Sequence, residues 1–194
     1  EHPELWGGLI DLDEATTPQV LLAALLQPQP DSETQTLYRR DLRYGARLVD
    51  HRLPAQPPTP VGIDAQATYL ITGGLGGLGL LVAEWLADQG AQHLVLTSRH
   101  GITTASQQAV VDRLTANGVT VQVAPVDVAD EPAMRALFAQ LATSEWPLKG
   151  VVHTAGVLDD AILLNQQWAR FAPVFAPKVA GGWLLHQLTA DLDL

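Results

Sequence analysis

The segment Thr72-Gly73-Gly74-Leu75-Gly76-Gly77-Leu78-Gly79 follows a short apolar run at residues 69–71 and precedes a helical pattern at residues 80–89. Two glycine templates overlap in this segment: GxGxxG on Gly74, Gly76 and Gly79, and TGxxxGxG on Gly73, Gly77 and Gly79. Between a strand and a helix, such glycines permit a tight turn, let the backbone approach a pyrophosphate and let the helix pack close to the strand. The free N–H groups at the start of the helix favour phosphate. The segment therefore predicts a dinucleotide-binding loop, with a merely flexible turn as the alternative.

The chain after residue 67 alternates between strand and helix patterns. Apolar runs at residues 69–71, 93–97, 119–126 and 150–153 predict four strands. Helical patterns occupy residues 80–89, 106–117, 132–141 and about 161–188, the last interrupted near Pro173 and Pro177. Strands that alternate with helices form βαβ units, and continuous apolar runs indicate that both faces of the sheet are covered. We therefore predict an α/β fold, a Rossmann-like doubly wound parallel sheet, over residues 68–194.

A proline-rich stretch separates this region from the start of the chain. Residues 53–60 contain four prolines, and residues 53–67 are predicted to be a linker because proline lacks the N–H that helices and strands use. Before the linker, residues 5–12 predict a strand, Thr17-Pro18 predicts the start of a helix that continues to residue 26, and residues 36–49 predict extended structure. Residues 1–52 are too few to enclose a good core, and they are expected to complete another domain.

Composition narrows the class of protein. The chain has 194 residues, 47% of them hydrophobic and 16% charged, which excludes a disordered protein and allows a core without disulfides. The formal net charge is −10, so a nucleic-acid binder, which needs a basic face, is not expected. The absence of cysteine removes thiolate metal sites and cysteine nucleophiles. Without a signal segment or an apolar run that crosses a bilayer, a cytoplasmic location with no membrane partner is expected.

The residues after the second predicted strand indicate which cofactor is preferred. An NAD site places an acidic residue there to hold the ribose 2′-hydroxyl. Here the strand ends in Thr97-Ser98-Arg99, so no carboxylate repels a 2′-phosphate and the Arg99 guanidinium offers donors to it; a surface arginine is the alternative. Asp127 ends the third strand and is expected either to accept from an adenine amino group or to cap the following helix.

Histidine supplies no metal site in this sequence. His153 ends the fourth predicted strand, and neither it nor His186 has partners at metal-ligand spacing apart from Asp159 and Asp160. A histidine in this position is expected to be a hydrogen-bonded loop residue.

Several of these motifs resemble the short-chain dehydrogenase/reductase fold. They are Thr72-Gly73 with Gly77 and Gly79, Thr97-Ser98-Arg99, Val126-Asp127-Val128, and Val152-His153-Thr154-Ala155-Gly156. Two further stretches, at residues 156–160 and 177–186, resemble the ketoreductase domain of modular polyketide synthases. Residues 4–12 resemble the end of the structural subdomain that precedes the catalytic one in that family. The resemblance implies a structural subdomain ending within residues 1–52 and an NADPH-binding catalytic subdomain over residues 68–194.

The activity that the resemblance implies is a reduction. The β-keto group of an acyl chain, carried on the phosphopantetheine of an acyl carrier protein, accepts hydride from NADPH and becomes a β-hydroxyacyl group. Lys178 matches the catalytic lysine of the family, which binds the nicotinamide ribose and lowers the pKa of a tyrosine acid. Cofactor contacts are implied at Thr72, Gly73, Leu75, Gly76, Gly77, Leu78, Ser98, Arg99, Asp127, Val128, Thr154, Ala155 and Gly156.

A short acidic motif bears on stereochemistry. Leu158-Asp159-Asp160 follows the fourth strand and resembles the B-type signature of this family, which goes with a 3R hydroxyl. Carboxylates in a loop at the carboxyl ends of the strands can bias how the substrate approaches. The alternative, which does not exclude this role, is that one aspartate caps the next helix.

The sequence departs from the family at the proton donor. Tyr38, Tyr44 and Tyr69 all precede Lys178, and no tyrosine follows it. Because the chain begins at Glu1 and its only methionine is Met134, we expect a piece of a longer synthase that stops before the serine, tyrosine and asparagine and is inactive alone. Two alternatives remain: a non-catalytic structural module of a megasynthase, and a free-standing short-chain dehydrogenase, against which residues 1–60 argue.

Overall fold

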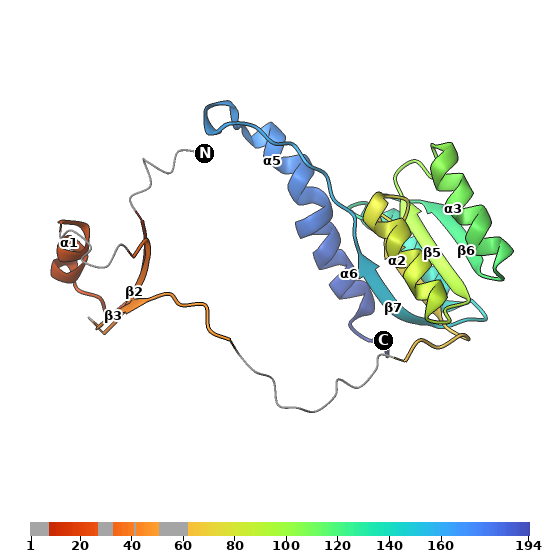
Figure 1. Ribbon diagram of the computed structural model, residues 1–194, viewed down its shortest axis with the longest axis horizontal. Helices are drawn as coiled ribbons and strands as arrows, with labels where there is room; N and C mark the ends of the chain where they lie inside the picture. The colour runs from red at the N-terminus through yellow and green to blue at the C-terminus, as the bar shows by residue number, and fades with distance from the viewer. Residues whose placement is uncertain (1–7, 27–32, 41, 51–61) are drawn as a thin grey trace. The chain divides into compact units, whose positions relative to one another are not determined.

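The structure, a computed structural model, describes residues 8–26, 33–40, 42–50 and 62–194. The chain divides into two compact units, Glu1–Thr59 and Pro60–Leu194, which are described separately (Figure 1). Residues 53–61 of the predicted proline-rich linker, and residues 4–7 of the opening motif, lie outside the described residues.

The first unit contains a three-stranded sheet. Its elements are β1 (Leu9–Leu12), α1 (Pro18–Leu26), β2 (Gln35–Arg39) and β3 (Leu42–Gly45). β1 pairs in parallel with β2, and β2 pairs antiparallel with β3. The predicted extended stretch at residues 36–49 thus contains two strands, which turn at Arg40 with a φ of 50°. Pro18 is the first residue of α1, where its fixed φ suits a helix start and its missing N–H costs no hydrogen bond.

The second unit holds the predicted parallel sheet. Its strands are β4 (Thr68–Thr72), β5 (His93–Ser98), β6 (Thr120–Pro125) and β7 (Leu148–His153). Between them lie α2 (Gly77–Asp88), α3 (Ala105–Ala116) and α4 (Glu131–Ala142). All neighbours are parallel in the order β6-β5-β4-β7, which confirms the predicted Rossmann-like fold. The direction of winding reverses beside β4, and ligands of open α/β sheets bind at such a switch point, outside the carboxyl ends of the strands.

A loop and a single 3-10 turn follow β7 and lead into the helical rod, which is the name used here for residues 168–189. The elements are η2 (Leu163–Asn165), a single 3-10 turn, then α5 (Trp168–Phe175), η3 (Ala176–Gly181) and α6 (Gly182–Thr189). The last three run on without a break (Figure 1), although Pro173 and Pro177 lie inside them. Proline has no N–H to donate within a helix, and the helix departs from α-helical geometry at η3, which is a π-helical turn.

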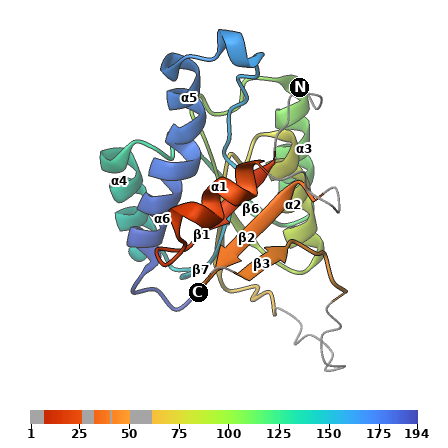
Figure 2. The same ribbon diagram turned by 90° about the vertical axis from the view of Figure 1, so that its left-hand side faces the viewer.

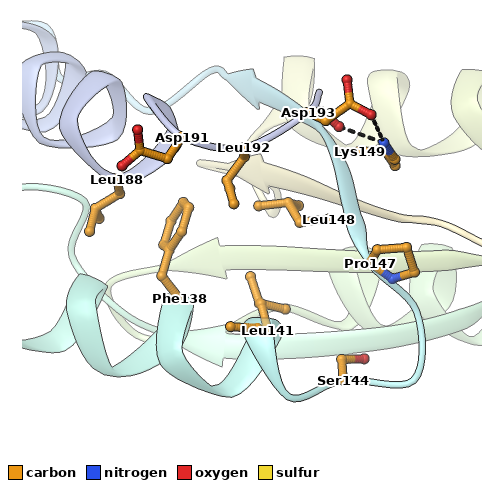
Figure 3. Close-up of a pocket in the computed structure, with 11 residues that line it drawn as sticks. Phe138, Leu141, Ser144, Pro147, Leu148, Lys149, Leu188, Asp191, Leu192 and Asp193 are labelled. Carbon is orange, nitrogen blue, oxygen red and sulfur yellow. Dashed lines mark hydrogen bonds and ion pairs between the residues drawn. The ribbon is translucent and has the colours of Figure 1, made fainter.

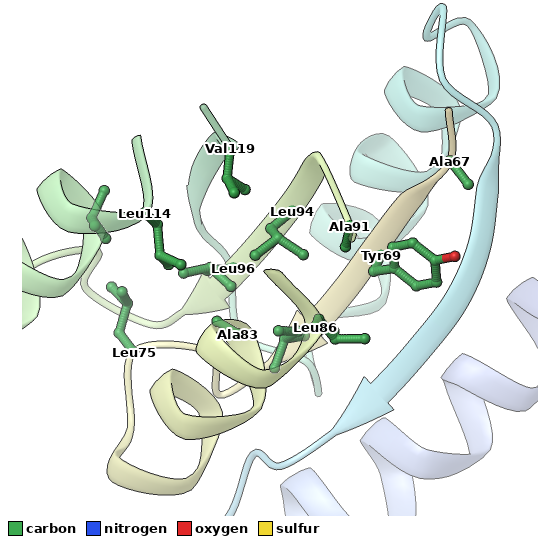
Figure 4. Close-up of a cluster of buried hydrophobic side chains, with 12 residues drawn as sticks. Ala67, Tyr69, Leu75, Ala83, Leu86, Ala91, Leu94, Leu96, Leu114 and Val119 are labelled. Carbon is green, nitrogen blue, oxygen red and sulfur yellow. The ribbon is translucent and has the colours of Figure 1, made fainter. Parts of the chain in front are cut away.

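Each face of the four-stranded sheet carries its own core. Alternate residues of β4 and β5 point to opposite sides: Ile71 and Leu96 pack with α2 and α3, whereas Leu70 and Val95 pack with α4 and α6. Figure 4 shows the first of these clusters, and in Figure 2 α4 and α6 lie together, apart from α2 and α3. Burial on both faces explains why the strands read as continuous apolar runs. None of the helices in the described ranges has the length and apolar content that a bilayer span requires.

Two helical glycines separate the effect of close packing from that of helix propensity. A Cβ at Gly79 would lie 2.4 Å from the carbonyl oxygen of Gly73, whereas a Cβ at Gly182 would meet no atom within 4 Å. We predict that Gly79→Ala lowers the free energy of unfolding by about 1–3 kcal/mol because the backbone of the loop must move. Gly182→Ala is expected to raise it by about 0.5–1 kcal/mol through helix propensity. Urea denaturation of both variants checks this, and equal effects would contradict the packing argument.

Candidate functional site

A cleft of about 420 Å³ lies at the carboxyl ends of the parallel strands. It is lined by residues that follow all four strands and by residues of α5 and η3. Many of the predicted cofactor residues line it: Gly73, Gly76, Ser98, Arg99, Asp127, Val128, Thr154, Ala155 and Gly156. The fold therefore gathers into one cleft residues that are spread over more than 80 positions of the sequence, from Gly73 to Gly156 and beyond.

The glycine loop forms the floor of this cleft through backbone contact. Gly73 has a φ of 66°, and a Cβ there would lie 2.7 Å from both the Cα and the N of Ala155. A Cβ at Gly74 would lie 2.8 Å from the carbonyl oxygen of Ile71. Gly77 differs, because a Cβ there would meet nothing within 4 Å. Close packing within the protein thus requires Gly73 from one template, Gly74 from the other and Gly79, which the two templates share, whereas the protein itself leaves open space at Gly77.

Helix α2 begins directly after the glycine loop, and its first turn has no side-chain cap. Its N-cap, Gly76, has no side chain to accept from the first N–H groups. By contrast, Thr104 and Gln107 form a capping box at the start of α3, and Asp130 accepts from the Ala133 N–H at the start of α4. Unsatisfied N–H groups at a helix start attract anions. The uncapped helix end beside the glycine loop is therefore suited to a pyrophosphate.

Four predicted cofactor residues do not line the cleft: Thr72, Leu75, Gly77 and Leu78. Thr72 is fully buried, and its hydroxyl bonds to His153. The Leu75 side chain belongs to the core beside α2, and its carbonyl accepts from Nε2 of Gln107 at 2.9 Å, which ties the loop to α3. Leu78 is exposed on α2. A contact between Leu75 and the cofactor therefore stays a prediction, and the structure shows that the Leu75 side chain is used in the core.

Hydrogen bonds join the ends of β4 and β7 beneath the cleft. The Thr72 carbonyl accepts from both the N–H and the hydroxyl of Thr154, at 3.0 and 2.7 Å. His153 bonds through Nδ1 to the Thr72 hydroxyl at 2.6 Å and through Nε2 to the Pro177 carbonyl at 3.0 Å. Burial lowers the pKa of His153, and the positive charge of Lys178 acts in the same direction. His153 is thus a hydrogen-bonded residue, and no group of three metal-ligating side chains occurs in the described part of the chain.

The end of β5 presents a cation and no carboxylate to the cleft. The Ser98 hydroxyl donates to the Gly101 carbonyl at 3.2 Å, so its proton is used within the turn. Arg99 is exposed, lines the cleft and forms no ion pair with a described residue. The Arg99 guanidinium is therefore the donor group available to a ligand here.

Asp127 belongs to the cleft rather than to a helix cap. Its Oδ1 accepts from the Ala129 N–H at 2.9 Å, which shapes the turn after β6, while Asp130 is the N-cap of α4. The capping alternative for Asp127 is wrong, because Asp130 stands three residues closer to the helix. The role toward an adenine stays a prediction.

The acidic loop after β7 is held by an arginine of α5. Nη2 of Arg170 donates to Oδ1 of Asp159 and, at 3.1 Å, to the carbonyl of Asp160. Neither aspartate caps a helix, since the N-caps of η2 and α5 are Ile162 and Gln167, so the capping alternative is wrong here too. Leu158 projects from the same loop with 86% of its surface exposed.

Lys178 lies on η3, next to the strand-end loop of β7. A Cβ at Gly156 would lie 3.2 Å from Cε and 3.5 Å from Nζ of Lys178, so the side chain passes over this glycine. Tyr69, the tyrosine among the described residues of the second unit, does not accompany it, because Tyr69 is buried in the core and its hydroxyl accepts from the Asp64 N–H.

Sequence analysis missed a wall of the cleft. Val157, Pro173, Ala176 and Pro177 line it, but none carries a polar group that marks a binding site. The two prolines were noted only as interruptions of a helix. Their contribution depends on how the helical rod packs against the loop, which no local pattern reports.

A second cavity lies at the other end of the sheet. Figure 3 shows its apolar wall of Phe138, Leu141, Leu148, Leu188 and Leu192, with a volume of about 470 Å³. At its rim Lys149 Nζ lies 2.5 Å from Asp193 Oδ2, and this hydrogen bond lowers the pKa of Asp193. Because the cavity surrounds the first residues of β7, it is separate from the cleft at the carboxyl ends of the strands.

Comparison with known families and sequences gives matches that include the whole cleft. Residues 67–194 match the family described as "KR domain". "Polyketide synthase GfsA" of Streptomyces halstedii is 40% identical over 201 residues, covering 100% of this chain and 3% of that protein. "Erythronolide synthase EryA3" of Saccharopolyspora erythraea is 37% identical over 194 residues, covering 100% of this chain and 6% of that protein. The chain therefore spans a small part of the length of these relatives.

Solved structures give the same family. One described as "Structure of A1-type ketoreductase" aligns with a TM-score of 0.79 and 39% identity, covering 100% of this chain and 41% of that chain. "The first ketoreductase of the tylosin PKS" aligns with a TM-score of 0.73 and 36% identity, covering 98% of this chain and 40% of that one. The comparison of structures and the comparison of sequences thus point to the same family.

Proposed function

The chain belongs to the KR domain family of polyketide synthases, and we propose that it serves the NADPH-dependent reduction of a β-ketoacyl thioester to a β-hydroxyacyl thioester. The observation that carries the proposal is the cleft, where an uncapped helix start and Arg99 converge without an opposing carboxylate at the end of β5. KR domains are oxidoreductases of the short-chain dehydrogenase type, which use nicotinamide cofactors. Within this proposal, the preference for NADPH over NADH depends on Arg99.

The residues present fit such a cofactor. Gly73 and Gly76 leave room for a pyrophosphate at the start of α2, where N–H groups are free to bind it. Arg99 would hold the 2′-phosphate, and Asp127 with Val128 would border the adenine. Bound NADPH supplies the hydride. The chain's own residues orient it, with Thr154, Ala155 and Gly156 next to Lys178, whose ammonium would bind the nicotinamide ribose.

The substrate and partners follow from the synthases that contain related segments. We propose an acyl chain carried on the phosphopantetheine of an acyl carrier protein, with residues 1–52 forming the end of a structural subdomain and residues 68–194 belonging to the catalytic one. Reduction adds hydride to the carbonyl carbon and a proton to the oxygen. In this family the proton comes from a tyrosine, whose pKa a lysine such as Lys178 lowers.

A second candidate is a structural KR-like module without turnover. Both candidates predict cofactor binding, and only the first predicts product when the complete synthase is supplied with a β-ketoacyl thioester.

We further propose B-type stereochemistry, with a 3R product. The proposal rests on Leu158-Asp159-Asp160, which directly follow the cleft residue Val157, and on the hydrogen bonds from Arg170 to Asp159 and Asp160 that hold this loop. Overall likeness does not decide the matter, because similar folds include a structure described as A1-type and one described as C2-type.

Cofactor preference gives the first test of this proposal. Arg99→Ala is expected to weaken NADPH binding about 10- to 100-fold and NADH binding far less, because a charge-assisted contact to the 2′-phosphate is lost. Isothermal titration of residues 1–194 measures both dissociation constants. Arg135→Ala is the matched control, since Arg135 pairs with Glu131 on α4. Equal losses for both cofactors would mean that Arg99 does not bind the 2′-phosphate.

Turnover by residues 1–194 alone gives the second test. We predict no oxidation of NADPH with a β-ketoacyl thioester above background, because none of the described residues that line the cleft is a tyrosine that could donate the proton. Absorbance at the nicotinamide band measures this, with cofactor binding confirmed in the same sample. Turnover that disappears in Lys178→Ala would place the proton donor elsewhere.

The stereochemical outcome gives the third test. The complete synthase that contains this segment is expected to form mainly the 3R alcohol, and Asp159→Ala is expected to lower that preference while the fold stays intact, because Arg170 loses its partner. Asp112→Ala, which removes a carboxylate bonded to Gln108 on α3, is the control. Chiral chromatography of the product decides, and a mainly 3S alcohol from the unaltered protein would refute the B-type assignment.

A further inference from the structure

His153 connects two parts of the second unit that are distant in sequence. One ring nitrogen bonds to the Thr72 hydroxyl at the end of β4, and the other bonds to the carbonyl of Pro177, 24 residues further along the chain. A carbonyl oxygen only accepts, so Nε2 carries the proton. In the neutral ring Nδ1 is then the acceptor, and the Thr72 hydroxyl donates to it.

The loop that begins at His153 contacts the lysine turn twice. His153 binds the carbonyl of Pro177, the residue directly before Lys178, and Gly156 leaves just the room that Cε and Nζ of Lys178 occupy. One contact fixes the backbone at the base of the lysine, and the other borders the end of its side chain. Together they determine where the ammonium group stands relative to the cleft.

The lysine turn has an irregular helical backbone. Lys178 lies in the π turn η3, and Pro173 and Pro177 supply no N–H to the backbone ladder around it. π turns of this kind are frequent at functional sites. The His153 ring is the side chain that bonds to this turn from outside the helix.

We propose that His153 is a positioning residue, which places the Lys178 ammonium by holding the Pro177 carbonyl and the Thr72 hydroxyl with its two ring nitrogens. The consequence for reduction rests on the proposed function, in which Lys178 contacts the cofactor. The clamp itself is a property of this chain and is open to test without any cofactor.

The two lysines of the chain make a direct readout possible. After reductive ¹³C-methylation, Lys149 and Lys178 give separate dimethylamine signals in NMR, and Lys149 serves as the internal reference. His153→Asn is too short to reach the Pro177 carbonyl, whereas the amide of His153→Gln extends far enough to donate to it. We expect the Lys178 signal and its titration to shift in the asparagine variant and to stay near the native position in the glutamine variant. An unchanged Lys178 signal in His153→Asn, or an equal shift of Lys149, would overturn the proposal.

The ring itself reports its tautomer. ¹⁵N-histidine NMR, with the His153 signal assigned by its loss in the variants, is expected to show a proton on Nε2 and none on Nδ1 near neutral pH. Because burial and Lys178 lower the pKa of His153 from 6.5 in the folded state, the unfolded chain binds more protons just below that pH. The free energy of unfolding is therefore expected to fall as the pH drops below 6.5, and His153→Gln is expected to flatten that slope. A proton on Nδ1 would exclude the clamp.

A double-mutant cycle separates positioning from general stability. His153→Asn is expected to weaken NADPH binding about 3- to 10-fold in the native background and to have no effect in Lys178→Ala. Equal losses in both backgrounds would mean that His153 supports only the fold. If the native chain binds no NADPH, the proposed function fails, and the lysine NMR experiment still decides whether His153 positions Lys178.

Discussion

The backbone contact between the glycine loop and the strand-end loop of β7 is the constraint on which the cleft depends. A single carbon atom at Gly73 would lie 2.7 Å from Ala155, and one at Gly79 would lie 2.4 Å from the Gly73 carbonyl. Because glycine has no Cβ, β4, α2 and the end of β7 approach one another more closely than they could with any other residue at these positions. The cleft, the free N–H groups of α2 and the approach to Lys178 all follow from that proximity.

Hydrogen bonds between neighbouring strand ends carry this geometry across the site. Thr154 donates twice to the Thr72 carbonyl, and His153 connects Thr72 to the turn that bears Lys178. Each of these groups is at least partly buried, where an unmade hydrogen bond is costly, so the network defines one arrangement. The polar residues at the ends of β4 and β7 therefore serve mainly to fix the backbone, and they leave ligand contact to N–H groups and to Arg99.

The sequence predicts the fold well because both determinants of a parallel sheet are local. Apolar runs at β4 to β7 mark strands buried on both faces, and the ends of the four strands differ from the expected ones by at most two residues. The start of α2 was placed late, at residue 80 instead of Gly77, because glycine is a poor helix former and gives no helical signal. Within the site, Arg99 and Asp127 were predicted from their place after strands. The side chain of Leu75 and the contribution of Pro177 were not, because core burial and the packing of α5 and η3 depend on contacts distant in sequence.

The π turn at η3 changes how the chain tolerates insertions and deletions. Residues of an α-helix are spaced about 100° apart around its axis, so the wider turn between Pro177 and α6 offsets the faces of the rod before and after it. Gly181 packs against Val128, and Leu184 and Leu185 lie in the core beside α4, whereas Ala176 and Pro177 line the cleft. Removing one residue from Ala176–Gly181 would regularise the helix and turn Leu184 and Leu185 away from the sheet. The irregular turn thus sets the rotation between the part of these helices that lines the cleft and the part that packs in the core, and its length is as constrained as its composition.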